Sequence, residues 1–499
     1  MNPIEIPGYY YDAAKKRYFK IERDGTTPLT AEWAASNVKR RRKEEAEQAD
    51  VRKRKDLRLQ RRVKRAGLVE RSLVGGALKR ELGVRNAETA GEDGVKGWAA
   101  GLREKGEVMF SSVAGQNGDV GLMWVGGREG SDVGMVVGVM GKRMDETMAA
   151  YMVRDEDGKI SNEQAALRYT RSRPFNLHPP FPSISSVARQ PATNRLFFTP
   201  GTTYHRSLHI AFTNPAFDPD ADVPAFTQLS HPVPDKHALS VHTLVPAPPN
   251  ANLTAAIATS IGPALLHADG RFAFPKSRLP NNPKGRLPDI VAGDILSLAL
   301  LPDSPSTIIT GTRRCNIGLI DTRAGHSEWL TLHHPSPVGH LKPVAPFQIL
   351  VAGSRSAMAV YDIRYVKDGV DWTRLARREP NRTRSVVEFV GYENEAHVSA
   401  IGLDVLVEGG GGGAGVVAAA QGDGRVGLWS LRDGMRLGSR AVEGIDVEGN
   451  ERHARGWLSG RVVRCLQFAR MEGERESSLY VGEGGVVRKY GFGGHEEEW

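Results

Sequence analysis

Three arginines stand at the end of one short pattern that recurs in the second half of the chain. In each copy, apolar or aromatic residues are followed by a polar position, one further residue and Arg. The copies are Gly-Leu-Ile-Asp-Thr-Arg ending at Arg323, Ala-Val-Tyr-Asp-Ile-Arg ending at Arg364, and Gly-Leu-Trp-Ser-Leu-Arg ending at Arg432. Arg carries a planar fork of five N–H donors and is enriched at the energetic centres of protein interfaces. These residues are therefore candidate docking residues, with solvated charges or local ion pairs as the alternative.

The segments that carry these arginines share one plan, which predicts a repeat architecture. A β-type run leads to a small residue, a polar turn follows, and a second β-type run ends in an aromatic or aliphatic residue. Ile320 and Tyr361 are 41 positions apart, within the roughly 40–45 residues of a WD repeat. Three earlier segments, 106–170, 182–230 and 237–290, are weakly patterned but long enough in β-type runs to supply one blade each. We therefore predict an all-β chain with a seven-bladed WD40-type β-propeller over 106–493, in which Tyr361 and Trp429 pack between neighbouring sheets.

The part of the chain before the repeats divides into three segments. Residues 1–30 place alternating aromatics on either side of Asp12–Lys16, which predicts a short β-hairpin. Thr30 is a candidate N-cap and Gly67 a candidate C-terminal stop for one long helix over 31–67. The Gly-rich, charged stretch 84–105 is expected to be a linker.

The net charge of +9 is concentrated in that predicted helix. Residues 39–65 hold fourteen Lys or Arg and five Asp or Glu, so that 14 − 5 = +9, and the rest of the chain is formally neutral. Such a segment is typical of a nuclear import signal or a non-specific nucleic-acid contact, and a solvated charged helix is the alternative. The candidate residues are Lys39, Arg40, Arg41, Arg42, Lys43, Arg52, Lys53, Arg54 and Lys55.

Signals for catalysis or metal binding are weak. The Gly409–Gly415 stretch lacks the Gly-Lys-Ser/Thr of a phosphate loop. His333, His334 and His340 lie close together without Cys or carboxylate at ligand spacing, which favours turn histidines over a metal site. Cys465 falls in a β-type run and is expected to be a core thiol. We expect no cofactor, no metal and no enzyme activity.

Two cysteines and no long apolar run indicate a soluble protein of a reducing compartment, without a disulfide framework or a membrane segment. The basic segment adds the nucleus to the cytoplasm as an expected location.

The start of the chain, together with the repeats, resembles one family. Ile-Pro-Gly-Tyr-Tyr-Tyr-Asp at 6–12, Arg-Tyr-Phe at 17–19, the following basic helix and Ala-Val-Tyr-Asp-Ile-Arg-Tyr at 359–365 look like the WD-repeat cullin-4-associated factors. The resemblance covers 1–65 and 290–435 well and 106–290 loosely. It implies a non-catalytic subunit that binds the damage-specific DNA-binding adaptor of a cullin-4 RING ubiquitin ligase and presents a protein substrate.

In that family the adaptor contact ends a repeat as Trp-Asp-x-Arg. This chain keeps the Arg in all three copies, and each copy departs from the motif at the Trp or the Asp. By analogy the adaptor-binding residues are Asp321, Arg323, Asp362, Arg364 and Arg432, with Arg364 ranked first, Arg323 second and Arg432 third. The alternative function is a nuclear WD-repeat scaffold in RNA or ribosome assembly, with the basic helix touching RNA.

Overall fold

The structure is a computed structural model of the 499-residue chain. It describes residues 9–12, 17–20, 87–110, 119–127, 133–140, 144, 146–153, 175–176, 181, 183–203, 207–214, 226–233, 239–249, 251–274, 294–323, 330–365, 385–394, 401–407, 415–443, 463–471, 474 and 476–492. The chain divides into two units, Met1–Gly75 and Gly76–Trp499.

In the first unit, the described residues form two short strands, β1 (Tyr9–Asp12) and β2 (Arg17–Lys20). They pair in antiparallel register, with Tyr9 opposite Lys20 and Asp12 opposite Arg17. The predicted helix over 31–67, including all the candidate basic residues, lies outside the described residues.

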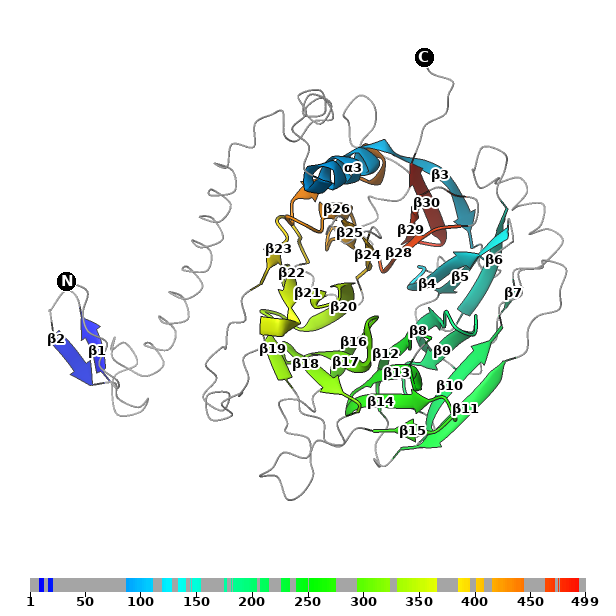
Figure 1. The fold of residues 1–499 in the computed structure, drawn as a ribbon, viewed down its shortest axis with the longest axis horizontal. Coiled ribbons are helices and arrows are strands. Elements are labelled where there is room, and N and C mark those ends of the chain that lie inside the picture. Colours follow the sequence, from blue (N-terminus) through cyan, green and yellow to red (C-terminus); the bar gives the residue numbers. More distant parts are fainter. Residues whose placement is uncertain are drawn as a thin grey trace, which may run out of the picture. The chain divides into compact units, whose positions relative to one another are not determined.

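The described part of the second unit is a β-propeller of seven four-stranded antiparallel sheets, numbered here as blades 1 to 7 in chain order of their innermost strands (Figure 1). Blade 1 consists of β4 (Leu122–Gly127), β5 (Val133–Met140), β6 (Glu146–Val153) and β7 (Phe175–Asn176). Blade 2 consists of β8 (Ile184–Arg189), β9 (Leu196–Pro200), β10 (Ser207–Thr213) and β11 (Thr227–Pro232). Blade 3 consists of β12 (Val241–Pro246), β13 (Leu253–Thr259), β14 (Gly262–His267) and β15 (Phe272–Ala273).

Blades 4 to 6 repeat this arrangement. Blade 4 consists of β16 (Ile295–Leu301), β17 (Ser304–Thr312), β18 (Asn316–Asp321) and β19 (Leu330–His333). Blade 5 consists of β20 (Val338–Ala345), β21 (Gln348–Gly353), β22 (Ala357–Asp362) and β23 (Val387–Glu388). Blade 6 consists of β24 (Leu403–Val407), β25 (Gly415–Ala420), β26 (Val426–Ser430) and β27 (Arg436–Leu437). A 3₁₀ turn, η2 (Ile363–Tyr365), follows β22, and a short helix, α6 (Arg440–Glu443), follows β27.

Blade 7 takes its strands from both ends of the unit. It contains β28 (Cys465–Ala469), β29 (Ser478–Glu483) and β30 (Val486–Phe492), and its outer strand is β3 (Leu102–Met109). β3 runs antiparallel to β30, with Leu102 opposite Phe492 and Met109 opposite Val486. In Figure 1 the blue β3 therefore lies beside the red β30 and closes the ring.

The stretch 84–105, expected to be a linker, is instead structured over its described part. Helix α3 (Ala87–Gly101) leads directly into β3. Val95, Trp98 and Ala99 of α3 recur at spacings of three and one and are buried in the core between blades 6 and 7, where Leu102, the first residue of β3, joins them. This is the apolar stripe of an amphipathic helix, and the glycines and charges around it obscured it in the sequence.

Successive strands of a blade run in opposite directions, so the turns that join them lie alternately on the two faces of the ring. Turns between first and second strands, and the ends of third strands, lie on one face, as the pairing of Ala345 with Gln348 and of Gln348 with Asp362 shows in blade 5. We call this the hairpin face. Turns between second and third strands, such as 421–425 in blade 6, lie on the opposite face, which we call the connector face.

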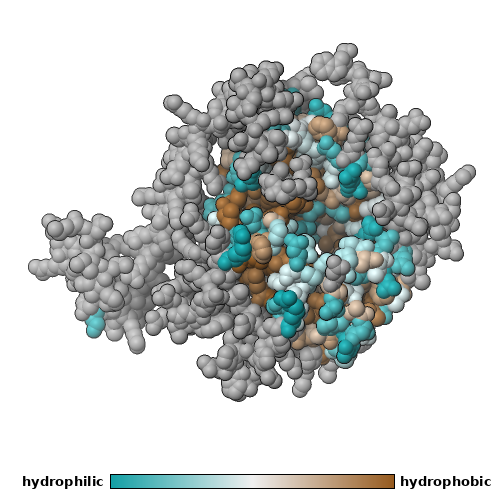
Figure 2. Space-filling view, in the orientation of Figure 1, coloured by the Kyte–Doolittle hydropathy of each residue, from teal (hydrophilic) through white to brown (hydrophobic). Residues whose placement is uncertain are grey.

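Apolar side chains fill the spaces between blades. The predicted packing of Tyr361 and Trp429 is confirmed, since they are 3% and 0% exposed, and Ile320 at the equivalent position is 1% exposed. Ile320 lies in the core between blades 3 and 4, Tyr361 in that between 4 and 5, and Trp429 in that between 5 and 6. Figure 2 shows hydrophobic residues gathered toward the middle of the ring, with hydrophilic residues among and outside them.

The innermost strands would leave backbone groups unpaired at the central channel, and side chains from neighbouring blades bond some of them. Buried backbone polar groups need such partners, because an unmet one costs about 1–3 kcal/mol. These bonds join Ser186 Oγ to Leu244 N at 3.1 Å, Ser297 Oγ to Val338 O at 3.0 Å, Asp404 Oδ2 to Phe468 N at 2.8 Å, and the Gln467 amide to Val125 N and O at 2.8 and 2.7 Å.

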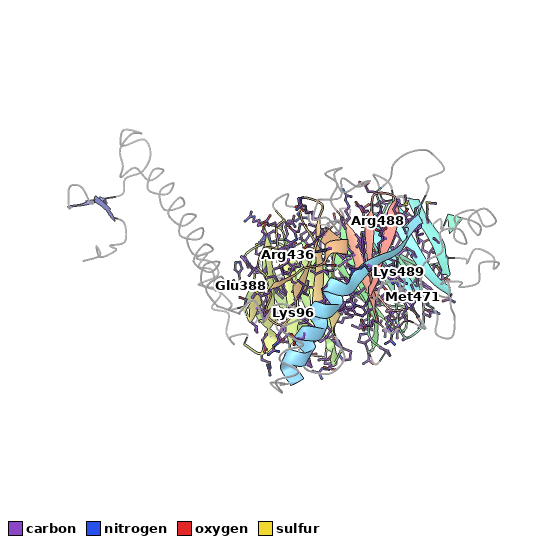
Figure 3. All side chains as sticks on the ribbon, turned by 90° about the horizontal axis from the view of Figure 1, so that it is seen from above. Lys96, Glu388, Arg436, Met471, Arg488 and Lys489 are labelled. Carbon is purple, nitrogen blue, oxygen red and sulfur yellow. The ribbon has the colours of Figure 1, made fainter. Side chains whose placement is uncertain are left out.

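Charges reinforce the closing strand. Arg488 on β30 forms ion pairs with Glu104 (2.7 Å) and Glu107 (3.2 Å) of β3, and with Glu483 of β29 (3.3 Å). Its side chain is 17% exposed, and burial raises the pKa of Glu483. In Figure 3, Arg488 and the adjacent Lys489 lie beside the strand that continues from α3.

Replacing Arg488 by Met should lower the free energy of unfolding by about 1–3 kcal/mol, because it leaves partly buried carboxylates without their counter-charge. Urea unfolding followed by tryptophan fluorescence measures this. Adding Glu483→Gln should restore part of the loss. Arg271→Ala, at an 84% exposed side chain, is the control and should change stability by less than about 0.5 kcal/mol. An unchanged midpoint for Arg488→Met would contradict the role of this residue.

Candidate docking face

The Asp-x-Arg sequence forms the same clamp at the end of the third strand in blades 4 and 5. Asp321 and Asp362 are the last residues of β18 and β22. In blade 5, Asp362 Oδ1 accepts the Arg364 backbone N–H at 3.0 Å and its Nε–H at 3.0 Å, and Asp362 Oδ2 accepts Nη2–H at 2.6 Å. The three corresponding distances in blade 4, between Asp321 and Arg323, are 2.9, 3.1 and 2.8 Å.

The clamp follows from local stereochemistry. An Asp side chain readily bonds the backbone N–H two residues later, and this turn brings the Arg fork back onto the same carboxylate. Hydrogen bonding by Arg364 lowers the pKa of Asp362, and hydrogen bonding by Asp321 raises the pKa of Arg323. The Asp362 carboxylate therefore stays ionised at neutral pH, and in both clamps the guanidinium is held in a fixed direction.

The two clamps differ in burial. In blade 5 the Asp362 side chain is 3% exposed and the Arg364 side chain is 57% exposed. A buried carboxylate therefore holds a guanidinium that is exposed to solvent. In blade 4 the corresponding values for Asp321 and Arg323 are 39% and 73%. Arg364 is thus the more firmly positioned of the two.

Arg432 occupies the equivalent position in blade 6 without this clamp. Ser430 takes the place of the Asp, is buried and has no carboxylate to bond a guanidinium. The nearby Asp433 carboxylate instead accepts the Met435 backbone N–H at 2.9 Å. Arg432 is half-buried, so the three arginines lie at equivalent strand ends on the hairpin face, but two share a geometry and the third does not.

A further Asp-x-Arg clamp on the hairpin face was missed in the sequence. In blade 3, Asp269 Oδ1 accepts the Arg271 backbone N–H at 3.0 Å, and Asp269 Oδ2 accepts Nε–H at 2.6 Å. It lies in the turn between β14 and β15, two residues beyond the strand. The only sequence signal was the tripeptide Asp-Gly-Arg itself, because the apolar strand ends two residues before the Asp instead of directly ahead of it.

The same spacing also occurs on the opposite face. Asp423 Oδ1 accepts the Arg425 backbone N–H at 2.9 Å in the turn between β25 and β26, and Arg425 Nε lies 3.6 Å from Asp423 Oδ2. The side chain of Arg425 is 51% exposed. The clamp by itself therefore does not define a docking site; its position on a face does.

The hairpin face is also where exposed apolar side chains gather. Among the described residues, the large hydrophobic side chains that are exposed are Phe347, Val386, Val407 and Phe492, at 47%, 51%, 42% and 49%. Phe347 is in the turn between β20 and β21, Val386 just precedes β23, Val407 ends β24 and Phe492 ends β30. All four thus lie on the hairpin face, in blades 5 to 7.

The histidines near this region are structural in the described part of the chain. His334 is fully buried, and its Nδ1 lies 3.0 Å from the Tyr361 hydroxyl. The Nε2 atom of His340, in the innermost strand β20, is buried. No cluster of three or more His, Cys, Asp or Glu residues that could hold a metal ion occurs among the described residues.

Cys465 lies buried in β28 as a free thiol, and burial raises its pKa to about 12. It is therefore a core side chain, as predicted. None of the helices in the described ranges has the length and apolar character needed to cross a membrane.

Compared with known proteins, the sequence matches no protein-family model and no curated protein. The fold therefore defines the class: this is a β-propeller, a class that often serves as a non-catalytic scaffold.

The stability of the propeller should fall in acid through His334. Burial lowers the pKa of His334 to about 4, whereas an unfolded His titrates near 6.5. The stabilisation of the neutral ring is complete above pH 6.5 and declines as pH falls toward 4, by on the order of 3 kcal/mol. Urea unfolding at pH 7.5, 6 and 5 should therefore show a shallower loss of stability in His334→Gln than in the wild type. Equal pH slopes in the two proteins would contradict this.

Proposed function

We propose that this protein is a substrate-receptor subunit of a cullin-4 RING ubiquitin ligase. It docks on the damage-specific DNA-binding adaptor through its hairpin face and recruits a protein for ubiquitination. The observation that carries the proposal is the pair of identical Asp-x-Arg clamps at the third-strand ends of blades 4 and 5, on the face where exposed apolar side chains gather.

The geometry suits a docking role for physical reasons. A guanidinium held by its own carboxylate loses little conformational freedom on binding, so less of the interaction energy is spent on ordering the side chain. Arginines next to exposed apolar side chains have the composition of interface centres. Arg364 combines a buried partner with an exposed fork and remains the first-ranked contact, followed by Arg323 and then Arg432.

In this proposal the protein contributes position rather than chemistry. The ligase reaction takes place on other subunits, and the rigid ring sets the distance and direction from the adaptor to the recruited substrate. Protein recruitment in the nucleus and cytoplasm is the corresponding cellular role. The scaffold role in RNA assembly depends on residues 39–65, and no described residue bears on it.

Replacing Arg323 and Arg364 together by Ala should weaken binding to the purified adaptor by at least about tenfold, because truncating an interface arginine costs about 2 kcal/mol or more. Surface plasmon resonance with the full-length chain measures the dissociation constant.

The matched control is Arg425→Ala, which removes a 51% exposed guanidinium from the same kind of turn on the connector face. We expect its affinity to stay within about twofold of the wild type. If the double variant binds as the wild type does, or if the wild type does not bind the adaptor, the proposed function is wrong.

A further inference from the structure

Phe347 and Arg364 form one exposed unit at the edge of blade 5. The Arg364 guanidinium carbon lies 5.0 Å from the centroid of the Phe347 ring, a cation–π distance. The Ile363 backbone N–H donates to the Phe347 carbonyl at 2.9 Å, which ties the turn that carries the ring to the turn that carries the arginine. Both side chains are about half exposed, at 47% and 57%.

This unit occurs in only one of the described clamps on the hairpin face. In blade 4 the turn between the first two strands carries Pro302 and Asp303, and no aromatic ring lies against Arg323 among its described contacts. In blade 3 Arg271 pairs with Asp269, and the Arg271 side chain is 84% exposed. Blade 5 therefore differs from its neighbours by an exposed aromatic surface beside a positioned positive charge.

We infer that Phe347 and Arg364 act together as the central anchor of the docking face. They bind a loop of the adaptor that presents an apolar side chain next to a carboxylate. This inference rests on the proposed function and names the residue and the partner chemistry within it.

The chemistry of the two side chains selects this partner. Burying the exposed part of the Phe347 ring against apolar atoms of a partner would stabilise the complex by about 25 cal/mol per Å². The exposed part of the Arg364 fork is best met by a carboxylate, which accepts two of its donors. A loop with one residue of each kind satisfies both, whereas a purely acidic loop would leave the ring in water.

Two smaller exposed apolar residues lie on the same face as the anchor. Val386 lies in the same blade and Val407 in the next, and both are exposed on the hairpin face. Interface centres with an aromatic and an arginine surrounded by smaller contacts that exclude water are the usual arrangement of binding hot spots.

The test is a double-mutant cycle on adaptor binding, with the full-length chain and the purified adaptor. Phe347→Ala and Arg364→Ala should each weaken binding by at least tenfold. The double variant should be weaker than the worse single variant by less than threefold, because both changes remove one unit. Arg425→Ala is the control: a 51% exposed arginine in an Asp-x-Arg turn on the connector face, away from the proposed interface. Its affinity should stay within about threefold of the wild type, and thermal unfolding of every variant confirms that the ring is intact.

Three outcomes separate the inference from the function on which it rests. If Arg364→Ala weakens binding and Phe347→Ala does not, the anchor is wrong and the docking face stands. If the two losses are additive, the residues act independently, and the composite anchor is again overturned. If the wild type does not bind the adaptor, the proposed function falls and the anchor falls with it.

Discussion

The ring depends on the hydrogen bonds between β3 and β30. These strands come from opposite ends of the propeller unit, and the Arg488–Glu104 ion pair that joins them spans 384 positions of sequence. Bringing such distant segments together costs conformational entropy. The hydrogen bonds and ion pairs between β3 and β30 offset this cost. The seam completes the last blade, and the closed ring fixes the positions of the hairpin-face residues relative to one another.

The seam explains why the stretch before the first blade is structured. Helix α3 covers the core between blades 6 and 7 through Trp98 and its apolar neighbours and delivers β3 to the open edge. The bonds of Gln467 to the Val125 backbone join blades 7 and 1 at the innermost strands, so the ring is closed at its rim and at its centre. Helix α3, the outer strand β3 and the Gln467–Val125 bonds thus all hold blade 7 in its place in the ring.

The docking face illustrates how a local motif acquires meaning from its place in a fold. Asp-x-Arg folds into nearly the same clamp in blades 3, 4 and 5 and, with a longer ion pair, on the connector face of blade 6. Local stereochemistry produces the clamp wherever the spacing occurs. What distinguishes blade 5 is the depth of Asp362 and the ring of Phe347, which reaches Arg364 from the preceding hairpin, 17 residues earlier in the chain.

The sequence by itself determined the repeat. Alternating apolar runs with small residues and polar turns predicted an all-β ring of seven blades, and the aromatic position ahead of the polar-x-Arg ending predicted the packing of Tyr361 and Trp429 between sheets. These features are local or periodic, so they can be read along the chain. Tertiary structure alone decided that 87–109 closes the last blade, that four exposed apolar residues share one face, and that Phe347 lies against Arg364. Each of these depends on which strands are neighbours in the ring, and hydrogen-bond pairing between distant segments leaves no periodic trace in the sequence.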